Sequence, residues 1–316
     1  MKTITFQAMG SKVFIAADSH DPSAISEIEK AETWFEEWEQ VLSRFRLNSE
    51  LSILNRHPGV AKKLSETFMR VLTTALEAEK LSGGLVTPTI LPELLASGYS
   101  MDFESLISRD GWELGQRPFI SLTSDPIKFD KRTRTVTLPF GTQLDFGGIA
   151  KGWAAHQAMT RLSQLAPVLV DAGGDIAISG PRSDGSAWPI GVANPFETGN
   201  VLELVMVSSG GLATSGRDYK RWRFNNMWQH HIIDPRTKHP ADTDVLTASI
   251  LADNVVHAEI YAKTALILGS EVGTKWLDQQ QDIQYLLILE DGSVIKNPGF
   301  IHKQWNELCL QNSINQ

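Results

Sequence analysis

Glycine-containing turns, spread over the whole chain, constrain the fold of this sequence more than any other feature. They lie at residues 9–11, 144–152, 171–175 and 213–216. Glycine has no Cβ, so the backbone N–H groups of such turns can approach a phosphate or an aromatic ring closely. The Gly147-Gly148 pair also precedes a predicted helix, whose N-terminal N–H groups favour an anion. Taken singly, each turn is more often structural than functional.

Strands and helices alternate irregularly along the 316 residues. Hydrophobic spacing predicts helices at 22–45, 65–82, 91–97, 149–165 and 257–268. Strands are predicted around a turn within 3–18, in the β-rich segment 118–146, and near 169–170, 176–178, 189–193, 202–208, 230–233 and 246–252, with a closing hairpin at 291–292. The pattern has no βαβ rhythm, repeat or linker, and it predicts an α+β fold. Length alone allows two domains or one large domain with two lobes.

Several nucleotide-binding and hydrolase classes are disfavoured by missing motifs. No G-x-G-x-x-G opens a βαβ unit, and no G-x-x-x-x-G-K-[ST] occurs, which argues against a Rossmann dehydrogenase or a P-loop ATPase. The absence of G-x-S-x-G argues against an α/β-hydrolase.

Charge and cysteine usage narrow the range of partners. The formal net charge is −8, and the basic residues are scattered, the densest cluster being Lys220, Arg221 and Arg223 among Trp222 and Phe224. This argues against binding of nucleic acid or an anionic membrane. A single cysteine excludes an internal disulfide and a cysteine-based zinc site. We see no signal peptide, lipobox or membrane span in the sequence, and therefore expect a cytoplasmic protein.

Two polar pairs are candidates for chemistry. Adjacent side chains on a strand point to opposite faces, so only one of His230 and His231 can enter a given site. A structural, hydrogen-bonded role is the commoner one for such histidines, although imidazole also suits proton transfer near neutral pH. Glu259 and Lys263 share one face of a predicted helix, where a solvated ion pair worth about 0.3–0.5 kcal/mol is the simplest interpretation.

Together, these segments resemble the ApbE family of FAD:protein FMN transferases. The resemblance runs from about residue 5 to residue 275 and rests on the order of seven motifs. They are Met9-Gly10; Leu42-Ser43-Arg44-Phe45 with Ser49 to Asn55; Thr87-Pro88-Thr89 with Gly98-Tyr99; Asp145 to Gly152; Val170 to Asp175; Ala213 to Tyr219; and His231 to Thr237.

The resemblance implies a single ApbE-type (T-fold-like) unit over residues 1–316, with FAD between two lobes and Mg²⁺ at the diphosphate. The implied reaction moves FMN from FAD onto a Thr or Ser of an acceptor flavoprotein and releases AMP. The implied cofactor-binding residues are Met9, Tyr99, Asp145, Gly147, Gly148, Lys151, Ala172, Gly173, Gly174, Asp175, Thr214 and Ser215. His231 matches the family's histidine and becomes the candidate base.

The implied metal site contains the departure specific to this chain. The resemblance calls for a backbone carbonyl, from Ala150 or a neighbour, with an Asp and a Thr four residues apart. Those two positions hold Glu259 and Lys263. Glu259 can still bind a hard cation, but a protonated lysine cannot be a ligand. We therefore expect that the Lys263 ammonium can take the metal's place and act in catalysis. Lys238 is a smaller departure, since the family usually has glycine there.

Two alternatives to the transferase stay open. One is a protein that binds FAD, or hydrolyses it to FMN and AMP, without flavinylating an acceptor; Lys263 favours this alternative. The other is an interaction protein that has lost the flavin site. Bulky residues at 147–148 and 173–174 would indicate such a loss, but the glycines are intact.

Overall fold

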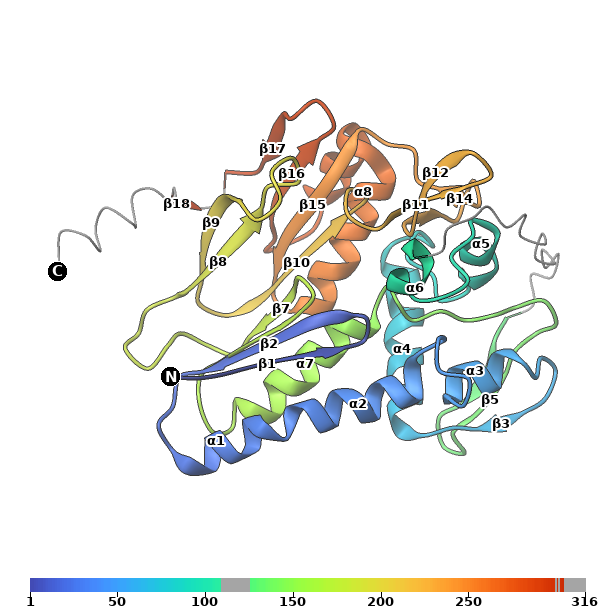
Figure 1. Cartoon of the computed structure of the whole chain (residues 1–316), viewed down its shortest axis with the longest axis horizontal. Coiled ribbons are helices and arrows are strands. Elements are labelled where there is room, and N and C mark those ends of the chain that lie inside the picture. Colours follow the sequence, from blue (N-terminus) through green and yellow to red (C-terminus); the bar gives the residue numbers. More distant parts are fainter. Residues whose placement is uncertain (109–125, 299, 301, 304–316) are drawn as a thin grey trace.

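An eight-stranded antiparallel sheet forms the centre of the molecule in the computed structural model, which describes residues 1–108, 126–298, 300 and 302–303 (Figure 1). Its strand order is β1-β2-β6-β7-β10-β15-β16-β17, and every neighbouring pair is antiparallel. The strands are β1 (Lys2–Ala8), β2 (Ser11–Ala17), β6 (Val168–Ala172), β7 (Asp175–Ile178), β10 (Gly210–Gly216), β15 (Val245–Ala252), β16 (Gln284–Leu289) and β17 (Val294–Lys296).

Helices cover one face of this sheet. Helix α7 (Ala150–Leu162) packs on β6 and β7, and α8 (Val255–Leu277) packs on β10 and β15. Helices α1 (Pro22–Glu29) and α2 (Ala31–Leu42) lie beside β1 and α7. The remaining helices are α3 (Glu50–Asn55), α4 (Glu66–Leu81), α5 (Leu91–Ala96) and α6 (Phe103–Ile107). With the small sheet β3 (Lys62–Lys63), β5 (Thr135–Thr137) and β4 (Lys128–Asp130), they form the right-hand part of Figure 1.

A second, smaller sheet covers the other face. It contains β8 (Trp188–Ala193), β9 (Val201–Val207) and β18 (His302–Lys303). Because successive side chains on a strand alternate between faces, each central strand serves two cores. On β16, Tyr285 and Leu287 join the core under the helices, while Leu286 and Ile288 join the core under β8 and β9.

Tight turns at one end of the main sheet need residues that tolerate positive φ. Met9 and Gly10, at φ 51° and 64°, connect β1 to β2, and Gly173 and Gly174, at φ 69° and 94°, connect β6 to β7. Two-residue hairpins of this kind require positive φ at both positions, which explains the glycines. All four residues face the same cavity.

Two further hairpins follow β10. Strands β11 (Arg221–Phe224) and β12 (Met227–His230) pair around Asn225 and Asn226, whose φ angles are 50° and 64°. Asparagine tolerates this conformation better than most residues do. Strands β13 (Ile233–Asp234) and β14 (His239–Pro240) form the second hairpin.

The α+β prediction is confirmed, while several element boundaries differ from the expected ones. The helix predicted at 22–45 is two helices, divided at Lys30 and ending at Leu42. The strand predicted at 230–233 is interrupted, since β12 ends at His230 and β13 begins at Ile233. Within 118–146, residues 118–125 lie outside the described part, and β4 and β5 are short. Helix α3 and strands β10 and β11 were not predicted.

Helix α8 extends beyond the predicted segment because its continuation starts afresh. The backbone at Gly269 leaves the helical region, with φ 79° and ψ 171°. Asp244 then accepts the N–H of Ser270 at 2.8 Å, which caps the second segment. No helix in the described part of the chain has the length and apolar character needed to cross a membrane. The division into two lobes stays a prediction.

The contact between β10 and α8 yields a stability prediction. A Cβ on Gly211 would lie 2.0 Å from the backbone N of Val255 and 2.2 Å from its Cα. Neither atom belongs to a flexible side chain, so we expect Gly211→Ala to lower the free energy of unfolding by at least about 2 kcal/mol. Urea denaturation measures this change. Gly180→Ala is the control, because a Cβ there has no neighbour within 4 Å among the described residues; equal stability of both variants would contradict the prediction.

Candidate functional site

A cavity of about 780 Å³ opens where the turns of the sheet meet the N-terminus of α7. Every residue predicted for the site lines it, except Ala172. Ala172 is on β6, and its side chain is buried in the core under the helices. The lining comes from segments far apart in the sequence, from Met9 to Lys263. The fold therefore brings the predicted residues together, and their individual roles remain proposals.

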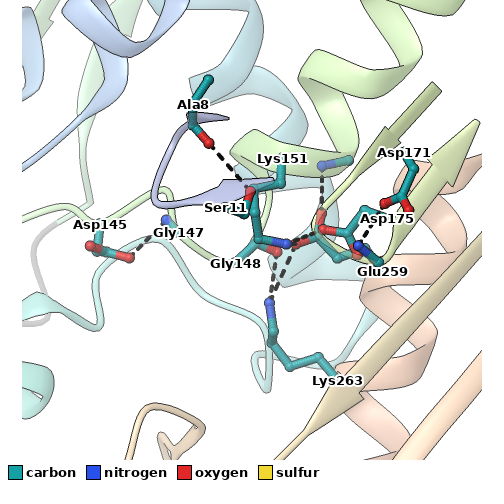
Figure 2. A network of polar contacts seen from close by, with 12 residues as sticks. Ala8, Ser11, Asp145, Gly147, Gly148, Lys151, Asp171, Asp175, Glu259 and Lys263 are labelled. Atoms are coloured by element: carbon teal, nitrogen blue, oxygen red, sulfur yellow. Dashed lines mark hydrogen bonds and ion pairs between the residues drawn. The ribbon is translucent and has the colours of Figure 1, made fainter. Parts of the chain in front are cut away.

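Buried charges from α7, β7 and α8 form a network at one end of the cavity (Figure 2). The Lys151 ammonium contacts Asp175 and lies 4.0 Å from Glu259 Oε1. Glu259 Oε2 accepts the backbone N–H of Gly152 at 3.3 Å, so a carboxylate from α8 stabilises the first turn of α7. The Lys263 ammonium donates to the carbonyl oxygen of Gly148 at 2.8 Å and lies 3.8 Å from Glu259 Oε1.

Burial and the neighbouring charges together set the pKa values of Glu259, Lys263 and Lys151. Burial, reinforced by repulsion from Asp175, raises the pKa of Glu259 to about 7. Burial lowers the pKa of Lys263, although Glu259 opposes this shift. For Lys151 burial also lowers the pKa, but attraction to Asp175 and Glu259 outweighs it, so the pKa is raised overall. Lys151 is thus the most firmly protonated of these groups.

The residues expected to hold magnesium do not fit a divalent ion as they are placed. In the turn expected to supply the carbonyl ligand, the Gly148 oxygen already accepts from Lys263. Mg²⁺ needs near-octahedral oxygen ligands at about 2.0–2.1 Å, and an ammonium cannot supply one. Within the described residues, no group of three or more His, Cys, Asp or Glu side chains is placed to hold a metal ion. The ammonium therefore stands between the two oxygen donors.

The two adjacent histidines have different surroundings. His230 is buried, its Nε2 lies 3.1 Å from the carbonyl oxygen of Ala241, and its Nδ1 accepts the N–H of Ile232 at 3.3 Å. His231 lines the cavity, and its buried Nδ1 has no hydrogen-bond partner among the residues described. Burial, followed by the charges of Lys220 and Lys263, holds the pKa of His231 well below its usual range. A neutral imidazole at this position can accept a proton.

Aromatic side chains line the other end of the cavity. The Tyr99 ring stacks on Trp222 with ring centroids 5.0 Å apart, and the Trp222 indole donates to the carbonyl oxygen of Ser97 at 2.8 Å. The Arg44 guanidinium lies 4.7 Å from the centroid of the Tyr99 ring and pairs with Asp145 at 2.9 Å. Asp145 also accepts the N–H of Gly147 at 2.8 Å. This end suits a flat aromatic group, and it connects to the charged network through Asp145 and Gly147.

Three further residues shape the cavity, although the sequence pattern does not single them out for the site. Arg44 appeared only within a motif, Lys220 only within a basic cluster, and Trp222 only as an interleaved aromatic. The available signal is the alternation of charged and aromatic residues at 221–224, directly after Lys220, which has the period of a strand. Arg44 and Lys220 line the cavity, and Trp222 supports Tyr99 from behind.

Fold and cavity define a class: an α+β protein with a cavity whose lining combines aromatic side chains with buried charged groups. A model of the ApbE family matches residues 9–287, and the chain belongs to this family.

The relatives agree with this assignment. The chain is 28% identical over 306 residues to the FAD:protein FMN transferase of Treponema pallidum, covering 87% of this chain and 80% of that protein. It is 26% identical over 281 residues to the enzyme of the same name from Haemophilus influenzae, covering 84% and 79%. Among solved structures, the ApbE protein of Thermotoga maritima has a TM-score of 0.80 at 24% identity, covering 95% of this chain and 97% of that one. The flavin transferase ApbE of Vibrio cholerae has a TM-score of 0.74 at 23% identity, covering 95% and 98%. These structures confirm the expected fold.

His230 yields a prediction about stability at acid pH. Burial lowers its pKa to about 4, and protonation of Nδ1 would break the bond from the Ile232 N–H. Because the unfolded chain binds this proton near pH 6.5, stability is present above that value and is lost as pH falls toward 4. We expect His230 to account for a loss of roughly 2 kcal/mol between pH 7 and pH 5. Urea denaturation of His230→Gln should show a loss smaller by that amount, and an unchanged pH dependence would refute the assignment.

Proposed function

We propose that this protein is an FAD:protein FMN transferase, which moves FMN from FAD onto a Thr or Ser hydroxyl of an acceptor flavoprotein. The observation that carries the proposal is the joining of three features in one cavity of about 780 Å³: an aromatic end, a lysine-rich end, and His231 with a free imidazole nitrogen. The names of the relatives support the same reaction.

Each end of the cavity suits one part of FAD. Tyr99, backed by Trp222, offers a face for an aromatic ring system. The turns at 147–148 and 173–174 allow close approach of the backbone to a diphosphate. Lys151 and Lys263 contribute positive charge at this end, where negative charge grows during cleavage of a P–O–P linkage.

In the proposed reaction, the acceptor hydroxyl displaces AMP from FAD. The acceptor hydroxyl oxygen attacks the phosphorus of the FMN half, and its proton passes to His231. The bond from that phosphorus to the bridging oxygen breaks, so AMP leaves with this oxygen and FMN stays on the acceptor as a phosphoester. The imidazolium then returns the proton to solvent. A neutral His231 before the step is what a general base requires.

Incubation of the purified protein with FAD and a candidate acceptor tests the proposal. We expect AMP release, measured by chromatography, and fluorescent flavin that stays with the denatured acceptor. His231→Ala should lower the rate by about 10²–10⁴-fold with nearly unchanged FAD affinity, because only proton transfer is removed. His230→Gln, which lies outside the cavity lining, is the matched control at pH 8.

The outcomes separate the competing functions. AMP release without a labelled acceptor would support the FAD-hydrolysing alternative in place of the transferase. Equal affinity for FMN and FAD would count against both, since the adenylate half must be recognised if AMP is the leaving group. Equal rates for the two histidine variants would remove His231 as the base.

The position of Lys263 supports a second part of the proposal: its ammonium neutralises the diphosphate where the family places a metal ion. It lies between the Gly148 carbonyl and Glu259, on the cavity wall. A divalent ion beside it would be repelled by several kcal/mol at low effective dielectric, before counter-charges are considered. The proposed reaction therefore does not involve magnesium.

Metal removal tests this part. We expect the wild-type rate of AMP release to change by less than about twofold when EDTA replaces Mg²⁺, because an ammonium already supplies the charge. The double change Glu259→Asp with Lys263→Thr restores two oxygen ligands, so it should create tight Mg²⁺ binding by calorimetry and an EDTA-sensitive rate. Tight Mg²⁺ binding by the wild-type protein would contradict the idea.

The chain offers a matched control on the same helix. Glu271 and Lys275 also form an i,i+4 pair on α8, at 2.9 Å, but both side chains are exposed. Glu271→Asp with Lys275→Thr makes the same chemical change away from the cavity. It should leave both the EDTA response and Mg²⁺ binding as in the wild type.

A further inference from the structure

The β11–β12 hairpin brings Lys220 and His231 to the same place. Its register pairs Arg221 with His230 as the last residues of the ladder. The next residue on each chain is Lys220 on one side and His231 on the other, and both line the cavity. Both residues lie just beyond the last pair of the ladder, and Lys220 is close enough for its charge to contribute to the lowered pKa of His231. The hairpin therefore delivers an ammonium and an imidazole together.

Lys220 differs from the other lysines of the cavity in having no partner. Lys151 contacts Asp175, and Lys263 contacts Gly148 and Glu259. For the Lys220 side chain, the described part of the structure records neither a hydrogen bond nor an ion pair, although the residue is half-buried. Burial and the charge of Lys151 lower its pKa, and attraction to Asp175 opposes them. A partly buried ammonium that forms no direct ion pair with the described residues indicates that an anion completes the site.

The other carboxylates of the cavity have partners of their own. Glu39 accepts the Met9 N–H and pairs with Arg46, Asp102 caps α6, and Asp218 accepts the Tyr219 N–H. Asp175 and Glu259 are engaged by Lys151 and Lys263, and Asp145 by Arg44. Lys220 is thus the cation of the lining that stays available to a ligand, among the residues described.

Trp222 anchors the strand that directly follows Lys220. Side chains alternate along β11, so Trp222 follows Lys220 on the inner face, where it is buried against Tyr99 and donates to the Ser97 carbonyl at 2.8 Å. Arg223 is on the outer face, exposed, with its guanidinium 5.0 Å from the centroid of the Trp228 ring. The two faces of one short strand thus separate a cavity cation from a surface cation.

We propose that Lys220 binds a non-bridging oxygen of the phosphoryl group that is transferred, beside the base His231. This inference rests on the proposed function and adds a substrate-contacting residue to it. The same ammonium disfavours protonation of His231 in the free protein, together with Lys263 from α8, Lys151 from α7 and His230 from β12. A bound phosphate then compensates the positive charge of Lys220. Lys220 would therefore stabilise the phosphoryl group under attack and also help to keep His231 neutral.

A flavin series tests the contact, because riboflavin, FMN and FAD differ in phosphate content. Lys220→Met should weaken FAD and FMN binding by about 10- to 100-fold, the usual effect of losing a charge-assisted hydrogen bond, and leave riboflavin binding within about twofold. Lys220→Arg keeps the charge and should retain FAD affinity within about fivefold. Calorimetry or flavin fluorescence gives the dissociation constants.

Arg223→Met is the matched control, since it removes one positive charge from the outer face of the same strand. It should leave all three affinities as in the wild type. Equal weakening of riboflavin and FAD by Lys220→Met, or equal FAD binding by Lys220→Met and wild type, would overturn the inference. The proposed function fails separately: wild-type protein that binds FAD through Lys220 but neither releases AMP nor labels an acceptor would refute the transferase and leave this contact standing.

Discussion

The buried carboxylate of Glu259 is the interaction on which the site depends. It reaches from α8 to the first turn of α7 and accepts the Gly152 N–H, so it fixes the position of the helix that follows the Gly147-Gly148 turn. Gly152 itself makes this approach possible, because a Cβ there would lie 2.6 Å from Glu259 Oε2. Removing the carboxylate would leave two buried ammonium groups nearby with less counter-charge, a costly arrangement in a low-dielectric interior. Glu259 therefore positions the helix after the glycine turn and supplies counter-charge to both lysines.

The cavity combines firmly paired charges with a few unpaired polar groups. Paired charges such as Lys151 with Asp175 hold their geometry without a ligand, which favours a preformed site. Groups without a partner among the described residues, such as Nδ1 of His231 and the ammonium of Lys220, carry an energetic cost in the free protein that a bound anion or hydroxyl can relieve. The division between them separates the scaffold of the site from the atoms available for substrate.

The sequence predicted local features of the fold well and non-local ones poorly. Gly173 and Gly174 were identifiable because a two-residue turn with positive φ limits the residues it can contain. Helix α4 was identifiable from its spacing and from the Gly83-Gly84 pair that follows it. By contrast, the break at Lys30 is not marked by glycine or proline, so the apolar spacing ran across it. The glycines and small residues of β10 lack the usual composition of a strand, so the sequence indicates a ligand-binding motif there and no strand.

The same limit applies to the site. The resemblance supplied most of the lining residues, but it did not show that the partner of Lys263 is the Gly148 carbonyl, 115 residues away. Nor did it show that Lys220 stands beside His231, which follows from the register of β11 and β12. The resemblance implies Ala172 as a cofactor-binding residue, although alternation along β6 turns its side chain into the core.

The wide spacing of the cavity residues along the chain has a consequence for folding. Met9 belongs to the first hairpin and Lys263 to the last long helix, so the cavity is complete only after most long-range contacts have formed. Assembly of such a site is a late event, since non-local pairing must overcome the entropy of closing large loops. A ligand that binds there stabilises the whole native state and not a single segment, by an amount that grows with the logarithm of its concentration. In a cell, the supply of that ligand would therefore govern how long the folded chain survives as well as how fast it works.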